Sequence, residues 1–469
     1  MIRRKRKTRK YSLLFFIILI SVTVWSYSSE IKDVFLHINT NDVLAESSLK
    51  ERDFSAVVKN IEVDELNAYI MEDHSNSLVS ISFLFKGAGN AYIQDGKEGI
   101  ANIVADLLTS GAGEYTEIEF KELCEEYGIK IGFSVSMDDF SGFIMFPSAN
   151  INVATKLLKA VLLETHFDEN YIDLTKKQMY VALDLQKERP DSVLANQFKK
   201  FIFKDHPYSR NSIGQMNDIE KIEEMDLRQY VENYLTQSNL LIGIAGDISE
   251  SDAKYFISET FGNLSKGSKY SKLPKFDFIS KIENYHITRD MPQIITRIVS
   301  KGTYRNNLDF YPLYLANYIF GEAGLSSRLS KAIREKAGLT YGIYTYLNIS
   351  DSKALIEGSF SVTPDNLDNA IDLLKREWKK MAKDGVSIEE LKQAKSSLIS
   401  SFNLRFASVN SISDMLVSMQ KFNLGQDFLN RRNDYIADVT LKEVNAAAKK
   451  YFNTIPTFVS IGNHKSEVK

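Results

Sequence analysis

Residues 320–341 read FGEAGLSSRLSKAIREKAGLTY. A glycine-containing turn is followed by a segment, 326–336, whose apolar residues recur at helical spacing. Gly338 comes shortly after it, where glycine commonly ends a helix by adopting a left-handed conformation. Apolar residues then alternate over 340–349 and again over 354–362. The sequence therefore predicts a turn, a helix and two strands in that order.

The same order of elements occurs about 210 residues earlier. Helices are predicted at 100–108 and 117–127, Gly128 is the matching cap, and strands are predicted at 130–137 and 140–146. Five short matches support the comparison: 85–87 with 300–302, 101–104 with 316–319, 129–132 with 339–342, 157–159 with 373–375, and 177–178 with 392–393. Because they occur in the same order at offsets of 210 to 216 residues, we infer a duplicated domain.

Each repeat combines strands with longer helices, predicted at 151–163 in the first repeat and 366–383 in the second. Strands grouped with helices that pack on one face of a sheet are typical of the α+β class. A polar stretch rich in lysine and serine, 265–275, is the expected boundary between the two repeats.

Composition excludes two classes of protein. The 469 residues carry a net charge of -3, and no segment of domain size has the basic excess that phosphate binding requires, which argues against a nucleic-acid binder. A single cysteine, Cys124, cannot form an internal disulfide framework. With 44% apolar residues, the chain can bury a large core.

The first 28 residues have the composition of a targeting segment. Seven basic residues lie between positions 3 and 10, an apolar run occupies 11–25, and small polar residues follow at 26–29. These are the parts of a secretory signal peptide. The apolar run is shorter than a comfortable membrane span, yet residues 11–25 could also remain as an anchor in the inner membrane. We therefore expect an exported chain, periplasmic or otherwise extracytoplasmic, whether or not residues 1–28 are removed.

The 320–341 stretch resembles the signature of the M16 metallopeptidases, the family of pitrilysin and the mitochondrial processing peptidase. Two further segments are similar to the family: His206-Pro207-Tyr208 and Ala245-Gly246-Asp247. The resemblance covers roughly residues 55 to 460 and implies two homologous α+β domains of the LuxS/MPP-like fold, each an antiparallel-rich sheet with helices on one face. It implies an N-terminal-type domain at 54–264 and a C-terminal-type domain at 276–469.

The zinc motif of active family members, His-x-x-Glu-His, is not preserved. Asn102 and Asp106 stand where the two histidines belong, and Ala105 stands where the catalytic glutamate belongs. Alanine can neither accept nor donate a proton, so the general base is lost. Near the expected third ligand the chain has 183–185, with no clear metal ligand. No two of the six histidines fall within four residues of each other, so we expect no metal site in this chain.

A second part of the family's site is kept. In M16 enzymes an arginine and a tyrosine seven residues apart reach the substrate carbonyl near the zinc, and Arg334 and Tyr341 have this spacing. A guanidinium and a phenol can donate hydrogen bonds to a developing oxyanion. Some M16 peptidases divide the site between a zinc-bearing chain and a second chain that keeps this pair. The resemblance implies that Arg334 and Tyr341 are catalytic and substrate-binding residues acting with a zinc-binding partner subunit on short or unfolded peptides.

Two other interpretations stay open. Some M16-like chains are non-enzymatic scaffolds or peptide-binding subunits of membrane-associated assemblies, and lost metal ligands fit that role too. An independently active hydrolase is the other possibility, although the sequence contains no Gly-x-Ser-x-Gly elbow and no phosphate-binding glycine-rich loop.

Overall fold

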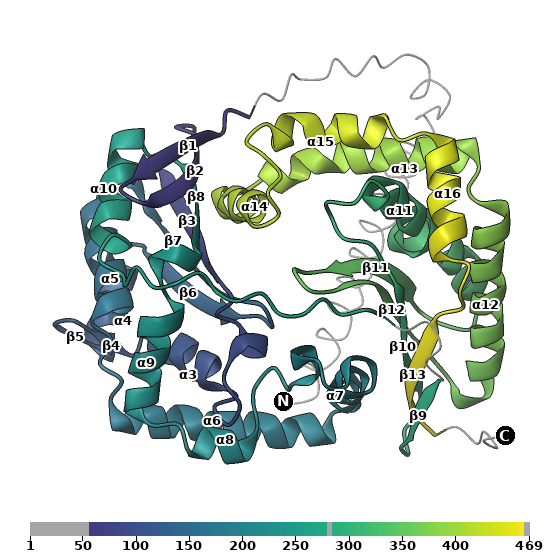
Figure 1. Cartoon of the computed structure of the whole chain (residues 1–469), viewed down its shortest axis with the longest axis horizontal. Coiled ribbons are helices and arrows are strands. Elements are labelled where there is room, and N and C mark those ends of the chain that lie inside the picture. The colour runs from purple at the N-terminus through teal and green to yellow at the C-terminus, as the bar shows by residue number, and fades with distance from the viewer. Residues whose placement is uncertain (1–55, 279–283, 464–469) are drawn as a thin grey trace, which may run out of the picture. The chain divides into compact units, whose positions relative to one another are not determined.

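The computed structural model describes residues 56–278 and 284–463 (Figure 1). The segments at 1–28 and 11–25, interpreted above as a signal peptide or anchor, lie outside these residues. Within the described ranges, every helix is too short or too polar to cross a membrane.

The first half of the chain forms a six-stranded sheet in the order β1-β2-β8-β3-β7-β6. Its strands are β1 (Lys59–Val63), β2 (Leu66–Glu72), β3 (Leu78–Lys86), β6 (Lys130–Val135), β7 (Asp139–Pro147) and β8 (Leu240–Gly246). Neighbouring strands are antiparallel except for the parallel pair β2 and β8. The apolar residues of β3 at positions 79, 81, 83 and 85 enter the first core, whereas Ser80 and Ser82 alternate with them on the opposite face.

Most helices of the first half pack around this sheet and the first core. They are α3 (Ile100–Leu107), α4 (Glu117–Glu126), α5 (Ile151–Leu163), α6 (Glu169–Glu188), α7 (Pro190–Phe203), α8 (Met216–Glu220), α9 (Glu224–Tyr234) and α10 (Glu250–Thr260). A small ladder joins β4 (Gly111–Ala112) to β5 (Tyr115–Thr116). Gly128, at φ 63°, follows α4, and Ile129 donates back to the carbonyl of Cys124 at 2.7 Å. The predicted glycine cap is confirmed.

The second half forms a five-stranded sheet in the order β11-β12-β10-β13-β9. Its strands are β9 (Tyr285–Thr288), β10 (Ile294–Lys301), β11 (Ile343–Ile349), β12 (Ala354–Val362) and β13 (Thr457–Gly462). Only β13 and β9 pair in parallel among the described strands of this sheet. Strand β11 starts three residues later than the prediction, because the Thr340 hydroxyl donates to the carbonyls of Gly342 and Ser361 and holds 340–342 in a turn.

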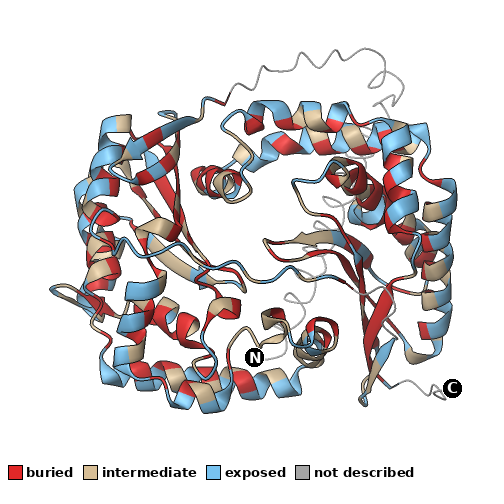
Figure 2. Ribbon diagram, viewed as in Figure 1, coloured by how far each residue is buried: buried red, intermediate tan, exposed pale blue. Residues whose placement is uncertain are grey.

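Most helices of the second half pack around this sheet in the same way. They are α11 (Phe310–Asn317), α12 (Leu367–Asp384), α13 (Ile388–Ser400), α14 (Val409–Lys421), α15 (Phe428–Ala437) and α16 (Leu441–Tyr451). Figure 2 shows that the strands of both sheets are largely buried and that the outer helices expose one side. The predicted α+β class with two similar halves is confirmed.

One helix of each half packs against the sheet of the other half. Helix α14 packs on β8, β3 and β2 of the first sheet, whereas α7 packs on β13 and β10 of the second (Figure 1). The two helices occupy equivalent places in the repeat, since α7 follows α6 and α14 follows α13, which carry the 177–178 and 392–393 match. Each sheet is therefore covered by its own helices on one face and by an exchanged helix on the other.

The exchanged helices make close contacts. Ser413 of α14 shares hydrogen bonds with Ser80 at 3.0 Å and Ser82 at 2.8 Å, and Lys421 forms an ion pair with Asp139 at the start of β7. On the other side, Leu194 and Phe198 of α7 join a third apolar cluster with Val299, Leu355, Val459 and Ile461 of the second sheet. Tight polar contact on one sheet and apolar contact on the other thus hold the two halves together.

Candidate functional site

Helix α3 carries the degenerate zinc motif and starts directly after Gly99. The backbone of Gly99 has φ 101°, and a Cβ atom there would lie 2.8 Å from the carbonyl oxygen of Ile213. Only glycine fits this conformation and this close approach. The apolar residues of the helix are buried in the first core: Ile100, Ile103, Val104 and Leu107.

Arg210 holds the loop that leads into α3. Its guanidinium donates to the carbonyl oxygen of Ile93 at 2.6 Å, lies 3.3 Å from the carboxylate of Glu98 and also pairs with Asp95. Since Glu98 immediately precedes Gly99, these contacts set where α3 begins.

Tyr208, from the His-Pro-Tyr segment, is buried between the two halves. Its hydroxyl donates to Asp138 at 2.5 Å and shares a hydrogen bond with Ser350 at 2.7 Å. Asp138 lies in the turn between β6 and β7, and Ser350 lies in the turn between β11 and β12. Burial and the neighbouring Asp138 raise the pKa of Tyr208, so the phenol stays neutral. This segment has a structural role in joining the halves, which its motif alone does not reveal.

The three positions of the former motif have a mixed environment. Asn102 is half-buried, and its Oδ1 atom has no hydrogen-bond partner among the described residues. Ala105 packs against the first core. Asp106 lies one turn after Asn102 on the same helix face, and desolvation by the surrounding protein raises the pKa of its carboxyl group.

The opposing surface of α6 supplies no third ligand. Met179 and Leu183 are buried in the first core, and Asp184 is exposed and paired with Lys187 at 2.7 Å. Across the described parts of the chain, no group of three or more His, Cys, Asp or Glu residues is placed to hold a metal ion. An amide, a lone carboxylate and an alanine do not make the donor set or the general base of a catalytic zinc site, so the residues of α3 do not fit zinc.

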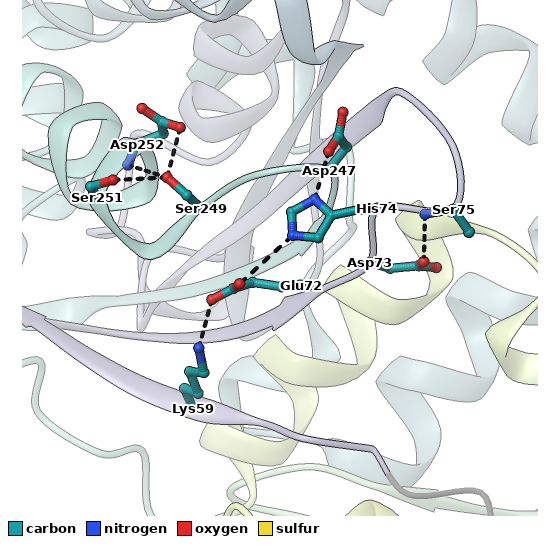
Figure 3. Close-up of polar contacts among 9 residues, drawn as sticks. All are labelled: Lys59, Glu72, Asp73, His74, Ser75, Asp247, Ser249, Ser251 and Asp252. Atoms are coloured by element: carbon teal, nitrogen blue, oxygen red, sulfur yellow. Dashed lines mark hydrogen bonds and ion pairs between the residues drawn. The ribbon is translucent and has the colours of Figure 1, made fainter.

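The histidines of the described residues lie apart from one another. His74 is bonded to Asp247 at 2.6 Å and lies 3.8 Å from Glu72, at the end of β2 and β8 (Figure 3). His166 and His206 contact the backbone carbonyls of Gly113 and Pro274. His286 contacts Ser460, and residues 37 and 464 lie outside the described ranges. Each of these four rings therefore makes ordinary structural hydrogen bonds.

Arg334 and Tyr341 lie at the surface of the second half. The segment predicted as a helix at 326–336 is a π-helix, η7 (Ser330–Lys336), preceded by a short 3₁₀ turn, η6 (Gly324–Ser326). After it, Gly338 at φ 64° donates to the Arg334 carbonyl at 3.2 Å and Leu339 donates to the Ile333 carbonyl at 3.0 Å. Each bond spans one residue more than in a Schellman motif, as expected at the end of a π-helix, and the left-handed Gly338 confirms the predicted cap.

Neither side chain of this pair is engaged within the described part of the protein. Tyr341 is 88% exposed and Arg334 is half-buried, and neither has a hydrogen-bond or ion-pair partner among the described residues. Buried Ile333 fixes the helix beneath Arg334. Tyr341 is thus open to solvent, and Arg334 is partly so from the end of η7. Helix α3 belongs to the first core and η7 to the second, and the structure shows no contact that joins the pair to Asn102 or Asp106.

Arg328, from the same signature, has a structural partner that sequence reasoning missed. Its guanidinium makes two hydrogen bonds to Glu390, at 2.7 and 2.6 Å. Glu390 also closes the capping box of α13, through the Ser387 backbone amide at 2.8 Å. The arginine of the Ser-Ser-Arg-Leu motif therefore ties η7 to the start of α13, and a bidentate pair of this kind fixes orientation as well as distance.

The side chains of Arg334 and Tyr341 can donate hydrogen bonds. Helix α3, in contrast, offers no general base and no metal ligand set. Strands β6 and β11 lie at the edges of their sheets, where an extended peptide can add as a further strand. These features define the class: an α+β fold of two similar halves in which α3 offers no ligand set for zinc.

Comparison with known proteins gives the same class. The description "Insulinase (Peptidase family M16)" matches residues 67–215, and "Peptidase M16 inactive domain" matches residues 221–398. A "Non-peptidase homolog YmxG" of Helicobacter pylori is 25% identical over 401 residues, covering 84% of this chain and 91% of that protein.

Two solved structures share the fold. A peptidase M16 inactive domain from Pseudomonas fluorescens matches with a TM-score of 0.81 and 23% identity, covering 86% of this chain and 97% of that chain. The periplasmic protease PqqL from Escherichia coli matches with a TM-score of 0.71 and 15% identity, covering 86% of this chain and 46% of that chain. The chain belongs to the M16 peptidase family.

Proposed function

We propose that this chain is the metal-free subunit of a two-chain M16 zinc endopeptidase that acts on short or unfolded peptides. In this proposal Arg334 and Tyr341 donate hydrogen bonds to the substrate carbonyl at a zinc ion held by the partner subunit. The single observation that carries it is the contrast between the two halves of the site. Within the described residues neither donor has a hydrogen-bond or ion-pair partner, and Tyr341 is exposed, whereas Asn102, Ala105 and Asp106 cannot supply a zinc ligand set.

Cleavage by the assembled pair tests this proposal. The chain would be co-expressed with an M16 chain from the same genome that carries His-x-x-Glu-His, and turnover of a quenched fluorescent peptide would be measured. We expect Arg334→Ala and Tyr341→Phe each to lower kcat by about 10²-fold, the effect of removing one donor to an oxyanion. Because both side chains are at the surface, the variants should still assemble.

A matched control is available on the same strand segment. Tyr344 is 51% exposed and lies three residues beyond Tyr341, at the start of β11. Tyr344→Phe should leave turnover unchanged. Full activity of both Arg334→Ala and Tyr341→Phe in the assembled pair would refute the proposed role.

Zinc content gives a second, independent test. The chain from residue 29 onward would be dialysed against trace zinc and its metal measured by elemental analysis. We expect no stoichiometric zinc, because α3 offers no ligand set. One zinc per chain would contradict the proposal, and Asp106 and His206 would then be the first ligands to test.

We also propose that residues 1–28 direct export and that the described halves correspond to domains 54–264 and 276–469. The basic and apolar composition of the first 28 residues supports export, and one structural relative is described as periplasmic. Fusing residues 1–28 to an alkaline phosphatase that is active only outside the cytoplasm tests this part, and an inactive fusion would contradict it.

A non-enzymatic scaffold or peptide-binding subunit is the alternative function. The name of the Helicobacter pylori relative, a non-peptidase homolog, favours it. The two functions differ in one result: a scaffold would co-purify with a membrane-associated assembly, and the zinc-bearing partner would cleave peptides equally well without it.

A further inference from the structure

A cavity of about 580 Å³ lies in the second half of the chain, lined by residues of α11, α14, α15 and the end of β11. This volume is in the range of small-ligand sites. Part of its wall is apolar: Leu347, Met415, Met419 and Leu424. Most of the rest is aromatic or charged, and three arginines line it: Arg305, Arg405 and Arg432. None of the three arginines belongs to the motifs discussed above.

Arg305 lies in the wall of this cavity without an anionic partner. Its guanidinium carbon is 5.2 Å from the ring centres of Phe310 and Phe422 and 5.7 Å from that of Phe428. The Nε atom is buried and has no hydrogen-bond partner, and no carboxylate among the described residues pairs with the side chain. Burial lowers the pKa of this guanidinium, which shows that its charge is poorly compensated.

Arg432 is also buried, with 8% of its surface exposed, and its hydrogen bonds go to neutral groups. It donates to the Leu398 carbonyl at 2.7 Å and to the Asn433 side chain at 3.1 Å, and it lies 4.5 Å from the ring centre of Phe402. Arg405, from the 3₁₀ segment Ser401–Phe406, is exposed.

Two carboxylates line the same cavity, and they offset only part of the charge of the three arginines. Asp414 accepts a hydrogen bond from Ser82 at 2.6 Å, across the contact between the halves. Glu322 accepts a hydrogen bond from Asn317 at 3.1 Å, and burial raises the pKa of its carboxyl group. The cavity therefore combines a positive charge excess with apolar and aromatic walls.

We propose that this cavity binds the free carboxylate of a peptide whose C-terminal residue is apolar or aromatic. An uncompensated buried cation is costly, and a carboxylate from outside would supply the missing hydrogen-bond acceptors in the planar geometry that guanidinium groups favour. The apolar wall would receive the side chain next to that carboxylate. This binding does not depend on the zinc-bearing partner, so it can be tested on the chain alone.

The test uses a fluorescein-labelled tetrapeptide that ends in phenylalanine, as the free acid and as the C-terminal amide, with binding followed by fluorescence anisotropy. We expect the acid to bind at least about tenfold more tightly than the amide, the worth of one charge-assisted hydrogen bond. An amide peptide with an internal glutamate distinguishes a side-chain carboxylate from a terminal one. Competition by inorganic phosphate as strong as that by the acid would show a general anion site and overturn the proposal.

Two substitutions should act in opposite directions. Arg405→Gln removes a positive charge from an exposed side chain and should weaken binding of the acid roughly tenfold without changing the amide. Glu322→Gln removes the competing carboxylate and should tighten binding of the acid, while the amide oxygen can still accept from Asn317. Arg297→Gln is the matched control, because Arg297 also lies over an aromatic ring, that of Phe198, but outside the cavity.

Binding of acid and amide with equal strength, or binding of neither, would overturn the proposal. It would also fail if Arg405→Gln, like Arg297→Gln, left the binding of the acid unchanged. Peptide cleavage is not part of this measurement, so its result is separate from that of the proposed two-chain enzyme.

Discussion

At the scale of single residues, His74 shows how protonation affects one end of the first sheet. Its hydrogen bond to Asp247 raises the pKa of the imidazole, and hydrogen bonds from Ser148 and His74 lower the pKa of Asp247 (Figure 3). The raised pKa means that the stabilisation from His74 is complete below about pH 6.5 and is lost as the pH rises through the folded-state pKa. The lowered pKa means that the stabilisation from Asp247 is lost as the pH falls below about 4.

We therefore expect His74→Gln to lower the urea midpoint more at about pH 5.5 than at about pH 8.5. The effect should be small, because the ring is exposed and the pair is screened by solvent. The control is the same substitution in an Asp247→Asn background, where the difference between the two pH values should disappear. An equal effect of His74→Gln at both pH values would contradict the assignment.

Sequence reasoning at this scale succeeded where the relevant residues are close in the chain. The caps at Gly128 and Gly338 are confirmed, because each depends on the backbone of its own turn. The partner of Arg328 could not be predicted, since Glu390 is 62 residues away and any acidic residue is an equally good candidate. Nothing in the sequence distinguished Arg305 from the other arginines. A cation without a partner can be recognised only from the residues that surround it in the structure.

At the scale of secondary-structure elements, the contact of α14 with the first sheet depends on Gly243 of β8. A Cβ atom at this position would lie 2.9 Å from the Leu416 Cβ and the Val417 amide nitrogen, and closer still to the Ser413 carbonyl. Backbone atoms of a packed helix cannot move aside as a flexible side chain can. We expect Gly243→Ala to lower the free energy of unfolding by about 2–3 kcal/mol, as overpacking does in a close-packed interior.

The control is Gly342→Ala. A Cβ atom at Gly342 would meet nothing within 4 Å, and this glycine is not among those with positive φ. Its substitution should change the unfolding free energy by less than about 0.5 kcal/mol. Equal stability of the two variants in chemical denaturation would show that the α14 contact is looser than described.

The positions of most elements were predictable, but their assignment to a sheet was not. Helices at 100–108 and 366–383 and the strand at 354–362 match α3, α12 and β12 closely, because the period of apolar residues is a local property. A helix has the same period whichever sheet it covers, so nothing in the sequence of α7 or α14 reveals the exchange between halves. The helix predicted at 326–336 starts two residues later, because the Ser327 side chain accepts from the Ser330 amide and caps the helix, and its winding is π-helical over Ser330–Lys336.

At the scale of the whole molecule, the exchanged helices should hold the halves together without the connecting segment. Residues 265–278 contain no helix or strand, and Ser271 and Lys272 are exposed. We expect a chain cut at a protease site inserted between them to elute from a sizing column as one species, because α7 and α14 stay packed on the opposite sheets. Fragments that separate without denaturant would contradict this, and the same insertion left uncut is the control.

The exchange of helices also determines the order in which the two halves can be completed during synthesis of the chain. Ser82 in the first sheet and Ser413 in the helix that covers it are 331 positions apart. At a synthesis rate of about 5–20 residues per second, the covering helix leaves the ribosome roughly 15–65 s after the strand. During that interval the sheet of the first half is open on one face, while α7 is already made and has no second sheet to cover. A polypeptide truncated anywhere before residue 409 would thus lack the covering helix of the first sheet and the complete second sheet. Cellular quality control would therefore recognise it as incompletely folded.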